Sequence, residues 1–336
     1  MRVLPILAAL AAAAIGLGAG NGAGAEPAKI RLGWIAPPDA PLFMFGKQGI
    51  TKHEGVSYTL EFVHFQGSPL IISALAAGEV DIAPLSYPSF TSAVGNAALS
   101  DLRIVADMFQ DGVEGWYTNA YMVLKDGPIK TVEDMKGKIY ATNSLGAAPD
   151  LAMRAMLRKH GLDDKKDVTI IEAAFPNMRA LLADHKVDAI MTPPPFSEEP
   201  ALRDIARTLF TMRDAVGVSQ LLALGGRKGF FDKNRAAVVD YMEDSLRELR
   251  WYSDPANHEE AVKIVSAFTK TPPQVWQSWL YTKGGDSYRD PNGRPNIAAF
   301  QSNVDMLHDL GFPNSDVVVS KYVDLSMMDE AAARLK

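Results

Sequence analysis

The sequence predicts an α/β protein with two similar Rossmann-like lobes joined by a hinge. Its most informative feature is a pattern that occurs twice, first in residues 73–83 and again in residues 180–190. Each copy is typical of a helix end, a tight polar turn and a buried strand, and Asp188 follows Asp81 by 107 positions. Strand and helix patterns also alternate along the chain, which is typical of doubly wound sheets. The 336 residues, 47% of them hydrophobic, are enough for two domains of ordinary size.

The first 25 residues are typical of a secretory signal peptide. Arg2 is a short basic region, residues 3–15 form an apolar run, and Ala23-Gly24-Ala25 is a small-x-small cleavage site. The apolar run is shorter than the roughly 20 residues that a membrane-spanning helix needs. The sequence has no cysteine, which excludes disulfides, thiolate metal sites and a lipidated cysteine anchor. We therefore expect an exported protein whose mature chain starts at Glu26.

The first lobe is expected to contain residues 26–114 and 215–336. Runs rich in β-formers predict its strands and the runs between them predict helices. The strands are expected at 29–35, 58–65, 81–85 and 102–109, and the helices at 42–52 and 70–77. Ser68 is expected as the N-cap of the second helix, with Pro69 at its first position. This βαβαβ order predicts a mainly parallel sheet.

The second lobe is expected to contain residues 115–214. Its strands are predicted at 117–125, 137–142, 168–173 and 187–190, and its helices at 150–160 and 177–184. The chain is expected to return to the first lobe between Thr211 and Leu224. Further amphipathic helices are predicted at 235–253, 258–268 and 296–310. The two crossings, near 111–117 and 211–218, are expected to act as the hinge.

Several short motifs occur in an order that resembles a known protein family. They are Gln66-Gly67-Ser68, Ala77-Gly78-Glu79-Val80-Asp81-Ile82-Ala83, Asp134-Met135-Lys136-Gly137-Lys138-Ile139, Asn143-Ser144, Gly161-Leu162, and Leu181-Leu182-Ala183 followed by Val187-Asp188-Ala189. In this order they resemble the periplasmic substrate-binding proteins of ABC importers for nitrate, sulfonates, taurine and thiamine-pyrimidine precursors, the NMT1/THI5-like family. One departure is His185, where that family usually has glycine.

The resemblance implies a type II periplasmic binding protein fold and a transport function. Such a protein is expected to close around a small-molecule ligand in the periplasm and to deliver it, as a monomer, to an ABC permease at the inner membrane. The residues agree with this expectation, because binding without chemistry needs hydrogen-bonding groups on two rigid lobes and a hinge.

Candidate ligand-binding residues lie where strands end or helices begin, since ligands of open α/β sheets sit beyond the carboxyl ends of the strands. These candidates are Trp34, Gln66, Ser68, Ser86, Tyr87, Trp116, Asn143, Ser144, Pro195 and Phe196. The polar members offer hydrogen bonds, and the aromatic members favour a ligand with a planar ring. A structural role is the alternative for each of them: a helix cap for Ser68, an ordinary turn for Ser86 and Tyr87, and core packing for the two tryptophans.

The remaining chemistry is sparse. The net charge is −6 with no basic block, so nucleic acid is not expected as a partner. The six histidines are dispersed, and neither a metal nor a cofactor is expected. We expect no enzyme activity, and the alternative is a secreted α/β hydrolase or lyase that uses the same cleft. An activated nucleophile or a metal in the cleft would favour that alternative.

The class of ligand stays open between two possibilities. Helix starts at Ser68 and Ser144 favour a sulfonate or carboxylate, because free backbone N–H groups at a helix start attract anions. Neither turn contains lysine or arginine, however, and Asp39 and Asp150 are expected near the cleft. An aliphatic or aromatic anion is therefore expected ahead of a neutral, pyrimidine-like ring.

Overall fold

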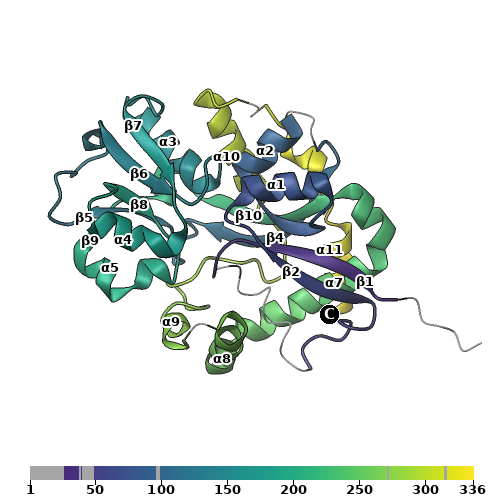
Figure 1. The fold of residues 1–336 in the computed structure, drawn as a ribbon. Helices are drawn as coiled ribbons and strands as arrows, with labels where there is room; N and C mark the ends of the chain where they lie inside the picture. The colour runs from purple at the N-terminus through teal and green to yellow at the C-terminus, as the bar shows by residue number, and fades with distance from the viewer. Residues whose placement is uncertain (1–25, 38, 40–48, 96–98, 271, 314–315) are drawn as a thin grey trace, which may run out of the picture.

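A computed structural model describes residues 26–37, 39, 49–95, 99–270, 272–313 and 316–336. Two five-stranded sheets covered by helices form two lobes, which confirms the predicted α/β fold (Figure 1). The predicted signal peptide and most of the helix predicted at 42–52 lie outside the described residues. Among the residues that are described, no helix has the length and apolar character needed to cross a membrane.

The first sheet has the strand order β2-β1-β3-β10-β4. Its strands are β1 (Ala28–Trp34), β2 (Tyr58–His64), β3 (Ile82–Ser86), β4 (Leu102–Asp111) and β10 (Ser219–Arg227). Strand β1 pairs in parallel with β2 and β3, but β10 is antiparallel to both of its neighbours. The sheet is therefore mixed, because the strand that returns from the second lobe enters it in the opposite direction.

The second sheet repeats this arrangement with the order β7-β6-β8-β5-β9. Its strands are β5 (Ala120–Leu124), β6 (Lys138–Thr142), β7 (Val168–Glu172), β8 (Ala189–Met191) and β9 (Ala206–Thr211). Here β5 is the antiparallel strand, and it occupies the same fourth place as β10 does in the first sheet. The sequence patterns did not predict β9.

The repeated sequence pattern corresponds to one structural unit present in each lobe. Asp81 Oδ2 accepts a hydrogen bond from the backbone N–H of Arg31 in β1 (2.8 Å), and Asp188 Oδ2 accepts one from Ile139 in β6 (2.9 Å). The backbone N–H groups of both aspartates also donate to the carbonyls of these same two residues. Each aspartate therefore joins the turn after its helix to the neighbouring strand. His185 adopts the left-handed backbone conformation (φ 53°) that the turn requires, so the turn keeps its shape without glycine.

Helices cover both faces of the first sheet. Helices α1 (Ser68–Ala77), α2 (Tyr87–Gly95) and α10 (Ile297–Asp309) lie on one side, and α7 (Lys228–Tyr252) and α11 (Ser326–Arg334) lie on the other (Figure 1). Helices α8 (His258–Thr269) and α9 (Gln274–Gln277) complete this part of the chain. The helices predicted at 235–253, 258–268 and 296–310 are thus confirmed, with α7 beginning seven residues earlier than predicted.

The N-cap predicted for α1 was wrong. Gly67, with extended backbone (φ −173°), is the N-cap, and Ser68 is the first residue of the helix, so its hydroxyl is not used as a cap.

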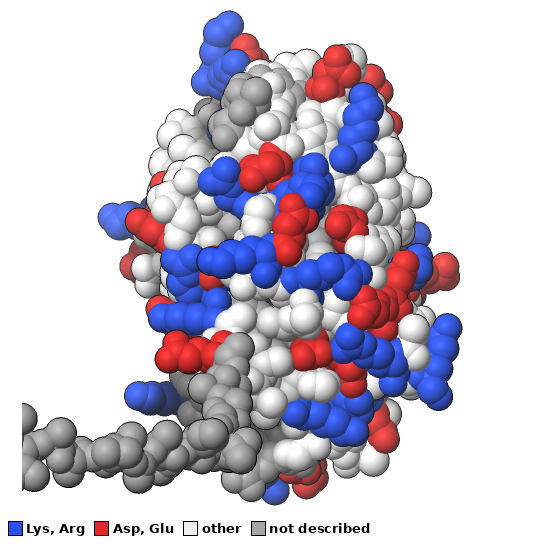
Figure 2. Space-filling view, turned by 90° about the vertical axis from the view of Figure 1, so that its right-hand side faces the viewer, with Lys and Arg blue, Asp and Glu red and all other residues white. Residues whose placement is uncertain are grey.

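Helices α3 (Ala148–Lys159), α4 (Met178–Ala183), α5 (Pro200–Ile205) and α6 (Met212–Val216) belong to the second lobe and to the return crossing. On the face of the molecule shown in Figure 2, basic and acidic side chains are interspersed, in keeping with the small net charge of −6.

The two crossings between the lobes touch each other. Gly112 and Gly217 both have positive φ (77° and 72°), and a Cβ atom on Gly112 would lie 3.1 Å from the carbonyl oxygen of Gly217. Asp111 at the end of β4 is fully buried and accepts hydrogen bonds from Thr118 Oγ1 (2.6 Å) and the backbone N–H of Asn119 (2.8 Å). The carboxylate of Asp111 therefore fixes the first crossing just before β5. Hinge motion at these segments stays a prediction.

Candidate functional site

A cavity lies between the lobes, beyond the carboxyl ends of β1, β3, β6, β7 and β8. The first lobe contributes Ile35, Ala36, Asp39, Ser68, Ser86, Phe109, Leu221, Leu222 and Ser287, and the second contributes Asn119, Asn143, Ala147, Ala148, Pro149, Phe175, Met191, Pro193 and Pro194. The walls are mostly apolar, with a few polar groups from each side. This composition is typical of sites that bind small organic molecules.

Three of the ten candidate binding residues line this cavity, namely Ser68, Ser86 and Asn143. Ser144, Pro195 and Phe196 are neighbours of lining residues in the sequence but do not line the cavity themselves. Phe196 instead stacks on Phe175, with ring centroids 6.5 Å apart. Whether these residues bind a ligand stays a prediction.

The other aromatic candidates do not line the cavity. Tyr87 is fully buried in the hydrophobic core and is not among the residues that line the cavity. Trp34 packs on His64 with ring centroids 4.2 Å apart. Trp116 makes an edge contact with Tyr288 at 5.6 Å. These three aromatic side chains pack against other residues of the protein, and whether any of them binds a ligand stays a prediction.

Gln66 joins the two lobes at the edge of the cavity. Its Nε2 donates to the carbonyl oxygen of Asn143 (2.7 Å), and Asn143 Nδ2 donates to the carbonyl oxygen of Gln66 (2.9 Å). Beside this pair, a Cβ atom on Gly67 would lie 2.5 Å from the Cβ atom of Ser144, so only glycine fits at position 67. The predicted ligand-binding motifs Gln66-Gly67-Ser68 and Asn143-Ser144 therefore form one of the contacts between the lobes.

Several lining residues had not been predicted as binding residues. Phe175 follows β7 just as Ser86 ends β3, so the strand-end rule applied to the predicted strand 168–173 would have found it. Asn119 lies directly before β5 in the first crossing. Asp39 was expected near the cleft from its position after the first strand, and it does line the cavity.

Asp39 is the only acidic or basic residue among the lining residues of this cavity that the structure describes. Its side chain is fully buried, and its Oδ2 atom accepts hydrogen bonds from the backbone N–H groups of Ile35 (2.6 Å) and Ala36 (3.2 Å). Burial raises the pKa of Asp39 to about 7, and the two backbone bonds and the positive charge of Arg289 oppose that rise. The carboxyl group is thus close to half ionised at neutral pH.

The described wall of the cavity contains no pair of groups suited to nucleophilic catalysis. Its hydroxyl groups belong to Ser68, Ser86 and Ser287, and no histidine, lysine or cysteine lines it. The hydroxyl of Ser86 donates to Ser89 Oγ (3.2 Å), which in turn donates to the Gly146 carbonyl oxygen (3.3 Å) across the lobes. A serine nucleophile needs a general base within hydrogen-bond reach, so these groups are suited to binding.

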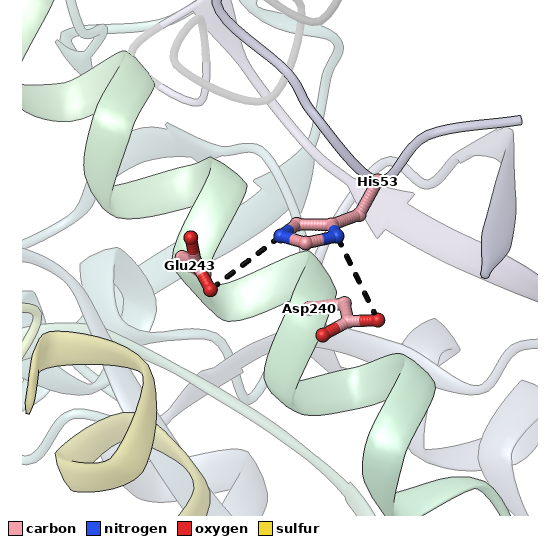
Figure 3. A group of neighbouring side chains, drawn as sticks. All are labelled: His53, Asp240 and Glu243. Atoms are coloured by element: carbon pink, nitrogen blue, oxygen red, sulfur yellow. Dashed lines mark ion pairs between the residues drawn. The ribbon is translucent and has the colours of Figure 1, made fainter. Parts of the chain in front are cut away.

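A second cluster of titratable side chains lies away from the cavity, where His53 faces Asp240 and Glu243 on helix α7 (Figure 3). The His53 ring nitrogens are 3.8 Å from Asp240 Oδ2 and 3.5 Å from Glu243 Oε2. Arg334 contacts both carboxylates (2.8 and 3.6 Å), and Arg247 pairs with Glu243. The two guanidinium groups neutralise these carboxylates, so the cluster has the character of an ion-pair network that ties α7 to α11.

Two α/β lobes that enclose a cavity between the carboxyl ends of their strands define a two-lobed binding-protein fold. Within that class the chain belongs to the NMT1-like family, whose sequence profile matches residues 23–266. A comparison with curated proteins gives no significant match.

Solved structures share this fold at low sequence identity. The alkanesulfonate-binding protein SsuA from Xanthomonas axonopodis pv. citri superposes with a TM-score of 0.70 at 21% identity, covering 89% of this chain and 99% of its own. The periplasmic nitrate-binding protein NrtA from Synechocystis PCC 6803 gives 0.72 at 18%, covering 93% and 90%. The desulfurization enzyme DSZB gives 0.65 at 13%, covering 92% and 100%. Both binding proteins and an enzyme therefore use this architecture.

Proposed function

We propose that this protein is the periplasmic solute-binding component of an ABC importer. It holds one small organic solute between its lobes and presents the closed form, as a monomer, to a permease at the inner membrane. The observation that supports this proposal is the cavity between the lobes, to which both lobes contribute polar groups and apolar walls. The signal peptide predicted from the sequence supports export, and the binding proteins for alkanesulfonates and nitrate share the fold.

The alternative is an enzyme, since a desulfurization enzyme also shares the fold. Shared architecture does not decide between binding and catalysis. The described cavity wall offers three serines and two asparagines without a histidine, lysine or cysteine to activate them. We therefore favour a receptor that releases its solute unchanged.

A thermal-shift panel tests the proposal, using taurine, alkanesulfonates, benzoates, phthalate, nitrate, aminopyrimidines and simple amines. A solute at 100 times its dissociation constant should stabilise the protein by about 2.7 kcal/mol. Small-angle scattering of the complex should show compaction, because a ligand that contacts both lobes favours the closed form. Mass spectrometry after incubation should recover the solute unaltered, and its conversion to a product would overturn the receptor function.

A matched pair of variants locates the site. Ser86→Ala removes a hydroxyl from the cavity wall and should weaken binding by about 0.5–3 kcal/mol if that hydroxyl contacts the solute. Ser92→Ala, on the exposed surface of the adjoining helix α2, should leave binding unchanged. Equal affinities of the two variants and the unmodified protein would place the solute elsewhere.

A further inference from the structure

We infer that the solute bound between the lobes is recognised through its own N–H groups, as an ammonium, amidinium or amino-substituted ring, and not as a sulfonate, nitrate or carboxylate. This inference rests on the proposed function and names the chemical class of its ligand. It reverses the order expected from the sequence, in which an anion came first.

The first observation is a set of three buried acceptor oxygens on residues that line one cavity. Asp39, Asn119 and Asn143 line the cavity and are each at least 96% buried. The Oδ1 atom of each accepts no hydrogen bond from the described protein, although all three atoms are shielded from solvent. A buried acceptor left without a donor costs about 1–3 kcal/mol, so three of them in one cavity indicate a ligand that donates hydrogen bonds.

The orientation of both asparagine amides is fixed by their other partners. Asn119 Nδ2 donates to the carboxylate of Asp111 (2.8 Å), and Asn143 Nδ2 donates to the carbonyl oxygen of Gln66 (2.9 Å). Turning either amide over would place its oxygen against another acceptor. The Nδ2 atoms are therefore committed to the protein, and the Oδ1 atoms remain for the ligand.

The second observation is that the described wall offers an anion no countercharge. No lysine, arginine or histidine is among its lining residues, and its one ionisable group is the carboxyl of Asp39. The helix start that follows Ser144 was expected to attract an anion, but its own first turn carries Asp150, whose Oδ2 accepts from the backbone N–H of Gly146 (2.8 Å). That carboxylate, which also pairs with Arg154 (2.8 Å), already accepts from the Gly146 N–H, so this N–H is not free for a second anion.

The third observation concerns the rest of the wall, which is apolar. Its larger members are Phe109, Phe175, Met191, Pro193, Pro194, Leu221 and Leu222. Such a surface suits a compact body with little polarity beyond the donor groups, such as a ring or a short hydrocarbon chain. The chemical class that satisfies all three observations is a small nitrogenous solute with an apolar body.

A set of isosteric probes tests the inference by isothermal titration calorimetry on the full mature chain. Benzamidine, benzamide, benzoate and benzenesulfonate share one ring and carry positive, neutral and negative polar groups. We expect benzamidine to bind at least tenfold more tightly than benzoate, with benzamide between them. Tighter binding of the two anions would overturn the inference and leave the proposed function intact. Absence of binding by every probe and by every member of the thermal-shift panel would overturn both.

Asp39→Asn provides the second arm of the test. The asparagine can still accept from Ile35 and Ala36 through its oxygen, while its amide nitrogen replaces Oδ1, the oxygen that has no partner in the described protein. The variant should lose at least tenfold in affinity for benzamidine and should lose less or gain for benzoate. Asp126→Asn, which removes the same charge at an exposed position outside the cavity, should change neither affinity. An unchanged preference in the Asp39 variant would overturn the inference even if benzamidine binds.

Discussion

Replacing Asp39 by asparagine should stabilise the protein, and increasingly so as the pH rises. Burial raises the pKa of this carboxyl from 3.8 to about 7. Between these two pH values the carboxyl is therefore mostly protonated in the folded protein and mostly ionised in the unfolded chain. The protonated carboxyl therefore makes its full contribution to the free energy of unfolding below pH 3.8, and this contribution is lost as the pH rises to about 7. At about 1.4 kcal/mol per pKa unit, the loss between pH 4 and pH 8 is roughly 4 kcal/mol. Asparagine carries no such penalty.

Urea unfolding of both proteins at pH 4, 6 and 8 measures this effect. Other buried acids, Asp107 and Asp111, also have pKa values raised by burial to about 7 and about 6, so the unmodified protein alone is not informative. The informative quantity is the difference in unfolding free energy between variant and unmodified protein, which should grow by roughly 4 kcal/mol from pH 4 to pH 8. A difference that stays constant within about 1 kcal/mol would refute the reasoning, because Asp39 would then have the same pKa in both states.

Two further predictions concern closure and ligand affinity. Gly67→Ala places a Cβ atom 2.5 Å from that of Ser144, so it should hold the lobes apart, weaken binding at least tenfold and abolish the compaction expected in small-angle scattering. Gly229→Ala, with no atom within 4 Å of its new Cβ, is the matched control. Affinity for benzamidine should rise about tenfold between pH 6 and pH 8, because the ionised fraction of a group with a pKa of about 7 rises from roughly 0.1 to 0.9. A flat calorimetric profile would contradict this.

The lobes and most strands could be predicted because their signals are local. Asp81 and Asp188 follow the same helix–turn pattern, and each accepts a hydrogen bond from a backbone N–H of the neighbouring strand in its lobe. Strands buried on both faces, such as β3, read as short apolar runs. Strand β9 was missed because its sequence, Ala-Arg-Thr-Leu-Phe-Thr, places a charged residue in a short run at the edge of the sheet.

The site was only partly predictable, because the direction of a side chain depends on tertiary packing. The strand-end rule placed Ser86 at the cavity correctly but gave no means of separating it from Tyr87, whose ring is in the core. Asn119 lies in a crossing whose path is set by the buried carboxylate of Asp111, a contact that no sequence pattern indicates. The inference about the ligand class depended on which amide atoms of Asn119 and Asn143 were already hydrogen-bonded, and only the structure shows those bonds.

The place of β10 in the first sheet determines the order in which the chain can fold. Strand β10 lies between β3 and β4, although more than a hundred residues separate it from the end of β4. Until residues 219–227 have been synthesised, β3 and β4 have no strand between them, and each exposes a strand edge that can pair with a non-native strand. The second sheet, by contrast, needs only the continuous segment 120–211. As the chain emerges from the ribosome, the residues of the second sheet are therefore all available before those of the first sheet are.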